Sequence, residues 1–234
     1  MTSECAIWDL RTDENFFDSK KINHSNLSHI VVKSSNPMDL LREWYHDVKK
    51  YADPNCTMPN LMNLATCNSD GEVHARNLYM RQIVNDNIHI MTDRRGTKCK
   101  DLIENTNVAC TFFWCFTKNN IKYARQVRIQ GIAKELNTEE TQKMYSNEPL
   151  YCKIRSHLCH QGLPVEWTEA KAKHDKMYEE VLAGKNPLPM PDHVVGFEIV
   201  PHKFDYYQAD GEIIGDRVVF EMKWGKWENY HVYS

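Results

Sequence analysis

The sequence lacks several features that would assign it to a specialised class of protein. No apolar run approaches the ~18–20 residues needed to cross a bilayer. The N-terminus, MTSECAIWDLRTDENFF, has no basic segment followed by an apolar one, so we expect no export signal. A net charge of −3 gives no general electrostatic footprint for nucleic acid, and the basic residues form no stripe interleaved with aromatics. Internal repeats and low-complexity segments are also missing.

The eight cysteines include no C-x-x-C pair. A chain of this size does not need a disulfide framework, and without an export signal we expect reduced thiols. His157, Cys159 and His160 lie close together, but no second cluster completes a four-ligand zinc site. The sequence therefore favours a cytoplasmic protein without a bound metal.

What is present describes an ordinary globular protein. Hydrophobic residues make up 41% of the 234 residues and charged residues 26%, which is enough apolar material for one substantial core or two small ones. Residues 1–35 are polar and weakly periodic, and we interpret them as a flexible N-terminal arm or an irregular wrap. Residues 36–234 are predicted to form a single domain.

The periodicity of apolar residues predicts a mixed but mainly β chain. A first helix begins after Asn36 as N-cap and ends before Asp53-Pro54. Further helices are predicted at 97–105, 138–147 and 165–183, with 150–164 irregular. Strands are predicted at 60–67, 73–82, 86–92, 108–114, 125–136, 194–200, 203–208, 217–224 and, finally, near 227–233. This order favours one antiparallel barrel with helical decoration.

Two basic segments are candidate anion sites. In the predicted three-stranded meander at 64–93, Arg76 and Arg81 lie on opposite faces of the middle strand. A buried cation is costly without a partner, so these arginines favour an anionic ligand. The turn Arg94-Arg95-Gly96 precedes a helix and is interpreted either as a phosphate cradle or as a solvated basic turn.

Taken in order, the motifs from Asn36 to the C-terminus resemble the pyridoxine (pyridoxamine) 5′-phosphate oxidase family. The matching segments are NPMDLLREW, LATCNSDGEVHARNLYMR, TKCKDLIEN, ARQVRIQG, the HQ pair 160–161, VVGFEIVP and the tail YYQ…DRVVF. A hairpin loop around 115–124 is longer than usual. The resemblance implies a mainly β (α+β) fold, namely an antiparallel Greek-key FMN-binding split barrel with peripheral helices. It also implies a homodimer with FMN in clefts at the subunit interface.

The resemblance also implies a set of cofactor contacts. Arg76 is expected to meet the flavin phosphate. The family's Ser-Arg-Lys run becomes Gly96-Thr97-Lys98, so Arg94, Arg95 or Lys100 would have to supply the missing charge. The expected FMN-binding residues are Arg76, Asn77, Leu78, Tyr79, Met91, Thr92, Thr97, Lys98, Gln126, Gln161, Tyr207 (a tryptophan in the family) and Arg217.

The expected substrate site departs much further from the family. A lysine, a tyrosine, an arginine and a serine hold the substrate phosphate there, and these positions are Arg81, Met144, Glu148 and Cys152 here. Arg81 and Cys152 remain candidate substrate-binding residues, whereas Glu148 would repel a phosphate.

Other parts of the site also differ. The family's R-L-H segment, which embraces the substrate ring, reads Ile213-Ile214-Gly215, and the R-x-x-Y lid motif is not evident. Tyr145 could restore the lost hydroxyl, and Lys153, Arg155 or His157 could rebuild a phosphate site. No catalytic residue is assigned.

Three functions follow as hypotheses. The first is FMN-dependent oxidation of pyridoxine or pyridoxamine 5′-phosphate to pyridoxal 5′-phosphate with O2 as acceptor. The second is a diverged FMN-binding homologue that acts on another, more apolar substrate, which Ile213, Ile214 and Met144 would suit. The third is a non-catalytic binder of FMN or pyridoxal phosphate. All three imply a small-molecule ligand, without nucleic acid or membrane partners.

Overall fold

The computed structural model describes residues 26–234, except 56 and 212. Most of the expected 1–35 arm therefore lies outside the described residues. Over the described part, the helices are α1 (Pro37–Tyr51), α2 (Thr97–Glu104), α3 (Thr138–Ser146), α4 (Leu150–Leu158) and α5 (Trp167–Leu182). The strands are β1 (Leu61–Cys67), β2 (Val73–Tyr79), β3 (Gln82–Val84), β4 (Asn87–Asp93), β5 (Asn107–Lys118), β6 (Ile121–Glu135), β7 (Val194–Asp210), β8 (Asp216–Lys223) and β9 (Lys226–Val232).

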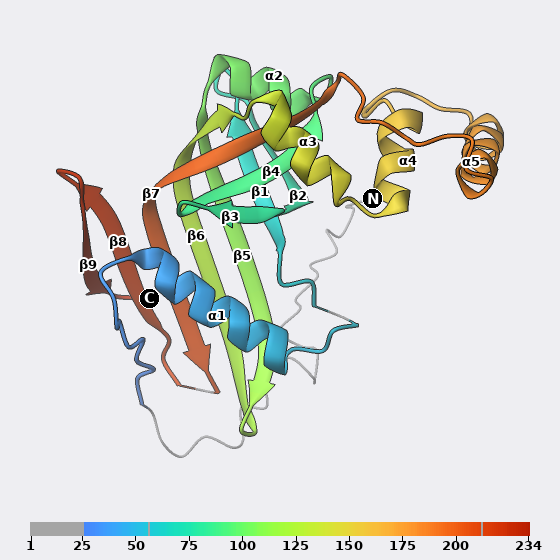
Figure 1. Cartoon of the computed structure of the whole chain (residues 1–234). Helices are drawn as coiled ribbons and strands as arrows, with labels where there is room; N and C mark the ends of the chain where they lie inside the picture. Colours follow the sequence, from blue (N-terminus) through green and yellow to red (C-terminus); the bar gives the residue numbers. More distant parts are fainter. Residues whose placement is uncertain (1–25, 56, 212) are drawn as a thin grey trace, which may run out of the picture.

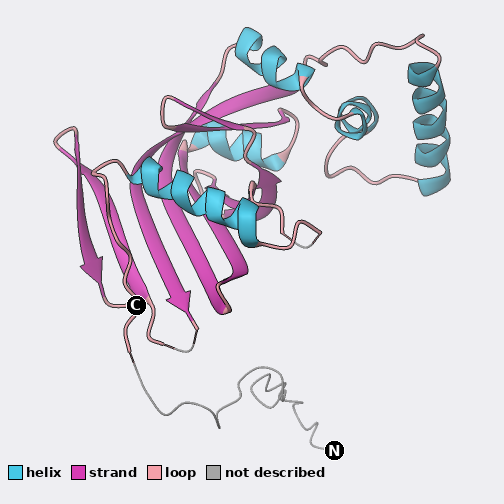
Figure 2. Cartoon of the chain, turned by 60° about the horizontal axis from the view of Figure 1, so that its bottom comes forward, coloured by secondary structure: helices cyan, strands magenta, loops and turns pink. Residues whose placement is uncertain are grey.

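The named strands form one curved antiparallel sheet that opens into a half-barrel (Figures 1 and 2). Its main path runs β2-β1-β5-β6-β7-β4-β3, and β8 and β9 extend it from β7. The long strand β7 serves two neighbours along one edge, because residues 194–199 pair with β4 and residues 203–208 pair with β8. The sheet therefore divides at β7 into a part that continues through β4 and a part that continues through β8. This arrangement confirms the predicted split-barrel fold class.

Helix α1 covers the concave side of the long strands (Figure 2). Its N-cap Asn36 accepts a hydrogen bond from the backbone N–H of Met38 at 3.0 Å. Trp44 meets Tyr206 of β7 edge to face with ring centroids 5.1 Å apart, and the Tyr206 hydroxyl donates to the carbonyl of Pro37 at 2.8 Å. The core therefore lies between α1 and the sheet, as the apolar face of this helix predicts.

The predicted three-stranded meander is wrong in its pairing. The middle strand breaks at the buried Met80, so β2 pairs with β1 while the short β3 pairs with β4. These two pairs lie at opposite ends of the main strand path. The two turns were predicted correctly, since Gly71, Asn85 and Asp86 all have positive φ. The break matters for function because it separates Arg76 from Arg81.

Three other expectations are corrected. The segment 115–124 is no long loop, because β5 and β6 stay paired up to a two-residue turn at Asn119-Asn120. The segment 150–164 is not irregular, since it contains α4. The two strands predicted at 194–200 and 203–208 form the single strand β7, whose pairing with β6 shifts register at Gln130/Gly131.

Helix α5 follows the prediction for 165–183 closely, but it buries none of its residues. It packs against α4 and stands away from the sheet (Figure 1). Among the helices of the described residues, none is both long and apolar enough to cross a membrane.

Candidate functional site

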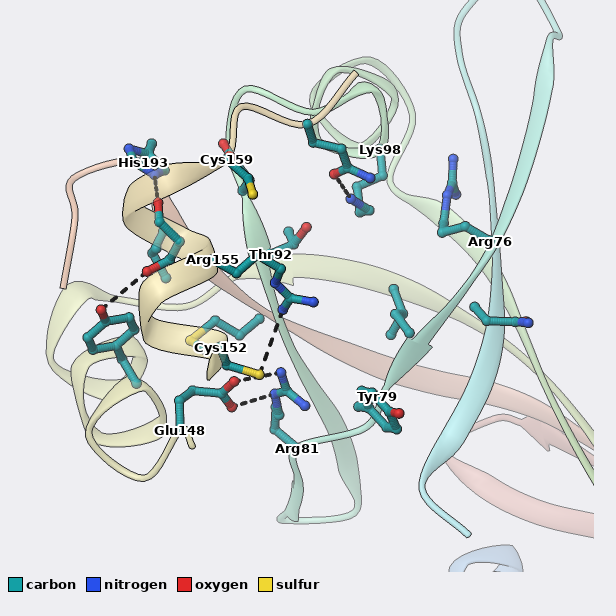
Figure 3. Close-up of a pocket in the computed structure, with 18 of the residues that line it drawn as sticks. Arg76, Tyr79, Arg81, Thr92, Lys98, Glu148, Cys152, Arg155, Cys159 and His193 are labelled. Atoms are coloured by element: carbon teal, nitrogen blue, oxygen red, sulfur yellow. Dashed lines mark hydrogen bonds and ion pairs between the residues drawn. The ribbon is translucent and has the colours of Figure 1, made fainter. Parts of the chain in front are cut away.

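A cavity of about 400 Å³ lies between the ends of β2 and β4, the helix α2, and the helices α3 and α4 (Figure 3). Ten of the predicted site residues line it: Arg76, Asn77, Leu78, Tyr79, Arg81, Met91, Thr92, Lys98, Cys152 and Gln161. Its walls also include Tyr145, Glu148, Arg155, Ser156 and His193. A volume of this size, with charged and polar side chains converging among apolar ones, is typical of small-molecule sites.

Arg76 faces one end of the cavity from β2. Its Nη1 donates to the Thr66 hydroxyl at 2.7 Å and to the Leu64 carbonyl at 3.2 Å, both on the neighbouring strand β1. Its ion pair with Asp101 is long, at 3.8 Å from Nη2 to Oδ2. Burial lowers the pKa of Arg76, and the charge of Asp101 offsets this only in part. Arg76 is therefore held in place with its positive charge incompletely balanced.

Lys98, in the first turn of α2, faces the same end of the cavity (Figure 3). It is only 6% exposed, and its Nζ donates to the side-chain carbonyl of Gln161 at 2.8 Å. Burial lowers the pKa of Lys98, Cys99 and Asp93 oppose this shift, and the nearby charges of Arg76 and Arg155 add to it, so that the pKa is lowered overall. Gly96 allows the close approach of Gln161, because a β-carbon at this position would lie 2.9 Å from Gln161 Oε1. A buried lysine with a neutral partner indicates an anion site.

The other basic residues around α2 do not reach the cavity. Arg94 pairs with Glu135, and Arg95 pairs with Asp93 at 2.6 Å while donating to the Cys159 carbonyl at 2.9 Å. Lys100 is exposed and does not line the cavity. None of these three candidates for the missing charge therefore supplies it. Only Lys98 of this basic segment points into the cavity.

The opposite end of the cavity contains an ion pair. Arg81 Nη2 donates to Glu148 Oε2 at 2.8 Å, and Arg81 Nε lies 2.8 Å from Oε1. The Nε–H does not point along this second line, so Nε makes no hydrogen bond. The two side chains are 17% and 6% exposed, respectively. The positive charge that the sequence assigned to substrate binding is thus already neutralised by a residue 67 positions away.

Helices α3 and α4 place two further residues in the cavity. Met144 points away from it, since its terminal carbon would touch a β-carbon at Gly196, and Tyr145 lines it instead. The Tyr145 hydroxyl donates to the Leu188 carbonyl at 3.2 Å and lies 3.2 Å from Ser156 Oγ. The family's tyrosine hydroxyl, absent at Met144, is therefore replaced by the hydroxyl of the neighbouring Tyr145, which already makes hydrogen bonds within the protein.

Arg155 is the second of these residues. Of the three alternatives considered for a rebuilt anion site, it alone lines the cavity. Lys153 donates to the Ser146 carbonyl at 2.8 Å, and His157 lies 2.7 Å from the Pro189 carbonyl. Arg155 follows Cys152 by one helical turn, a spacing that would have placed both on one helix face had α4 been recognised in the sequence.

Four predicted FMN-binding residues do not line this cavity: Thr97, Gln126, Tyr207 and Arg217. The last three form a lateral row across β6, β7 and β8, where Gln126 pairs with Tyr207 and Tyr207 with Arg217. Arg217 donates to Asp205 at 2.8 Å. Burial raises the pKa of Asp205, but hydrogen bonds from Arg217 and Arg128 outweigh this and lower it.

The segment Ile213-Ile214-Gly215 is also outside the cavity. Ile214 is instead bridged to Leu27, and a β-carbon at Gly215 would lie 2.6 Å from the Tyr207 ring. The Tyr207 side chain thus fills the space that a histidine at position 215 would need. The replacement of the family's tryptophan by Tyr207 and the replacement of its histidine by Gly215 therefore depend on each other.

Comparisons with known proteins define the class to which this fold and site belong. Residues 50–176 match the family model described as pyridoxamine 5′-phosphate oxidase. Because this match spans more than half of the chain, the chain belongs to that family, whose fold is the FMN-binding split barrel.

Individual relatives agree with this assignment. The pyridoxine/pyridoxamine 5′-phosphate oxidase of Leptospira biflexa serovar Patoc is 28% identical over 192 residues, which cover 82% of this chain and 86% of the relative. The crystal structure of PhzG from Burkholderia lata 383, in complex with tetrahydrophenazine-1-carboxylic acid, matches with a TM-score of 0.73 at 23% identity, covering 86% and 94% of the two chains. A pyridoxamine 5′-phosphate oxidase-related, FMN-binding protein from Nostoc punctiforme matches with a TM-score of 0.64 at 14% identity, covering 84% and 96%. At these identities, the two structures show the shared fold alone.

Proposed function

We propose that the chain binds FMN with the flavin phosphate between Arg76 and Lys98. The supporting observation is that the buried Lys98 and the half-buried Arg76 face one cavity end, and neither makes a hydrogen bond to a carboxylate within the described residues. A phosphate dianion would satisfy both through charge-assisted hydrogen bonds. The donor set therefore fits the phosphate of FMN, the cofactor for which the family's fold is named.

The FMN site is completed by a second copy of the chain in this proposal. Gln126, Tyr207 and Arg217 form a row outside the cavity, so they could meet a cofactor only in a neighbouring subunit. The same row continues to Phe113 on β5, which is 63% exposed. An exposed aromatic beside polar side chains is typical of an interface residue.

The reaction proposed for this site is oxidation of a small ring compound, with pyridoxine or pyridoxamine 5′-phosphate as the first candidate. The names of the curated relatives support this choice of substrate. Bound FMN would supply the hydride-accepting chemistry and pass electrons to O2. This chain's residues would hold the cofactor phosphate and orient the substrate beside Tyr79 and Thr92, which line the cavity.

A second candidate is oxidation of a substrate without a phosphate group. It is favoured by one observation, the Arg81–Glu148 ion pair, which places a carboxylate where a phosphate-binding cation is expected. A carboxylate in this position repels a dianion.

Absorbance and activity measurements test these proposals. The purified protein is titrated with FMN while the visible flavin spectrum is recorded, and formation of pyridoxal 5′-phosphate and H2O2 is then followed under air with each B6 phosphate. Saturable FMN uptake with product formation supports both FMN binding and the first candidate. FMN uptake without B6 oxidation contradicts the first candidate and leaves the second candidate or a non-catalytic FMN binder, and failure to take up FMN contradicts the proposed cofactor.

A further inference from the structure

The substrate end of the cavity carries one net positive charge. The ion pair between Arg81 and Glu148 cancels within itself. Arg155 is the remaining cation at this end, and it makes no ion pair with a carboxylate within residues 26–234 as described. Its only side-chain polar contact among them is with Cys152, at 4.0 Å from Nη2 to Sγ. The guanidinium is therefore available to a ligand.

The position of Arg155 directs this charge to the middle of the cavity. Figure 3 shows its guanidinium extending from α4 toward the space between Arg81 and Thr92. Arg155 also lies close enough to Lys98 for its charge to lower the pKa of that lysine. A ligand group bound by Arg155 would therefore lie between the Arg81–Glu148 pair and the proposed flavin site.

Glu148 is fixed and cannot easily withdraw to admit a phosphate. Its side chain is 6% exposed, and its backbone N–H donates to the Tyr145 carbonyl at 3.0 Å, directly before the Pro149 N-cap of α4. Freeing Arg81 would leave a buried carboxylate without its cation, which is strongly unfavourable. A dianion would meet the Glu148 charge, whereas a single carboxylate would need only one guanidinium, whose planar fork matches it.

We infer that the substrate of this site is a small ring compound with a single carboxylate, bound by Arg155, rather than a phosphate ester. The inference rests on the proposed FMN binding and on the second candidate function, since it assumes that the ring of a substrate without a phosphate group lies against FMN. It makes Arg155 and Glu148 the residues that determine specificity, with Arg155 attracting one negative charge and Glu148 rejecting two.

Three pyridine compounds of graded charge test the inference: nicotinamide (neutral), nicotinate (one carboxylate) and pyridoxine 5′-phosphate. Each is titrated by calorimetry into protein first loaded with FMN. We expect nicotinate to bind about tenfold or more tightly than nicotinamide, the size of one charge-assisted contact. Arg155→Gln should remove this preference. Lys153→Gln, an alteration on the same helix but outside the cavity, should keep it.

Glu148→Gln tests the rejection of the dianion. It should tighten binding of pyridoxine 5′-phosphate about tenfold, since it removes a negative charge and releases Arg81. The matched control is Glu139→Gln, on the exposed side of α3. If Glu148→Gln does not fold, Arg155→Gln and the wild-type ligand series still decide the question.

Two results would overturn the inference: equal binding of nicotinate and nicotinamide, or tighter wild-type binding of pyridoxine 5′-phosphate than of nicotinate. Failure of the proposed function is seen separately, as lack of FMN uptake in the loading step. In that case, the same titrations on the cofactor-free protein still report the charge preference.

Discussion

The two ends of the cavity use arginines that are five positions apart in the sequence, and they treat the positive charge in opposite ways. At one end, Arg76 is joined by Lys98, and no carboxylate hydrogen-bonds to either within the described chain. At the other end, Arg81 is held by Glu148. The positive charges at the first end are therefore available to an anionic ligand, whereas the positive charge at the second end is neutralised by Glu148.

This difference comes from the helices, not from the strands that carry the arginines. The break at Met80 sends Arg81 toward the C-terminal end of α3, where Glu148 lies, while Arg76 faces α2 and its lysine. A buried charge without a partner lowers the stability of the fold, so such charges are found mainly where a bound ligand of opposite charge compensates for them. The Arg76 end therefore has positive charge available to an anion, whereas at the Arg81 end Glu148 already neutralises the arginine.

The largest effect is expected from removing the cations at the Arg76 end of the cavity, where FMN binding is proposed. Arg76→Gln and Lys98→Met should each weaken FMN binding by about 10–100-fold, the value of one charge-assisted hydrogen bond of ~1.5–3 kcal/mol. Flavin fluorescence during titration measures the dissociation constant. The matched control is Arg94→Gln, since Arg94 belongs to the same basic segment but pairs with Glu135 outside the cavity. Equal losses in all three variants would show that Arg76 and Lys98 do not act by direct contact with the flavin phosphate, and that the Arg76 end has no special role in binding it.

A smaller effect, on stability, is expected at the substrate end. Glu148→Leu leaves Arg81 largely buried without its partner and should lower the free energy of unfolding by about 2 kcal/mol, the cost of one unsatisfied buried polar group. The double variant Arg81→Met/Glu148→Leu should recover most of this loss, because neither charge remains. For a chain of this size, the single loss corresponds to a fall in Tm of roughly 4–8 °C.

The control for this cycle is the exposed pair Glu139–Lys143 on α3, where no coupling should be measurable. Additive losses at positions 81 and 148, without recovery in the double variant, would mean that the ion pair does not satisfy Arg81. The contrast between the two cavity ends would then fail on the substrate side.

The sequence predicted the fold class, and it singled out Arg76 and Lys98, which the structure places at one end of the cavity; both predictions depend on local signals. Each of these signals is contained in a few consecutive residues: the Asn36 cap, the two turns with glycine or asparagine, and the apolar periodicity of each element. The same holds for Arg76 and Lys98, which lie within motifs of fixed spacing. What the sequence missed was pairing over long distances: the break at Met80, the union of two segments into β7, and the split of β7 between β4 and β8.

The substrate end shows this limit most clearly. The sequence showed that Glu148 would repel a phosphate, but not that it would bind Arg81, because their contact depends on how α3 packs beside β4. Arg155 was one of three open alternatives, and only the formation of α4 separates it from Lys153 and His157. Likewise, the packing of Tyr207 over Gly215 has no signature in either residue alone.

The smallest expected effect is a pH dependence of stability and of FMN affinity, and it involves only the Arg76 end of the cavity. Burial lowers the pKa of Lys98 below the ordinary value of 10.5, so this lysine loses its proton at a lower pH in the folded than in the unfolded chain. Within that window the unfolded state binds more protons, and stability rises with pH. The cost of burying the charge is therefore present at neutral pH and is relieved as pH rises toward 10.5.

Two measurements test this expected rise of stability with pH. Without cofactor, the stability advantage of Lys98→Met over wild type should shrink as the pH rises through this window, as followed by urea denaturation. FMN affinity should change in the opposite sense, weakening over the same window in wild type but not in Lys98→Arg, which keeps its charge. A difference in stability that is constant with pH would mean that Lys98 is not charged and buried at neutral pH. The Arg76 end would then hold one unbalanced cation instead of two, and its contrast with the Arg81 end would rest on Arg76 alone.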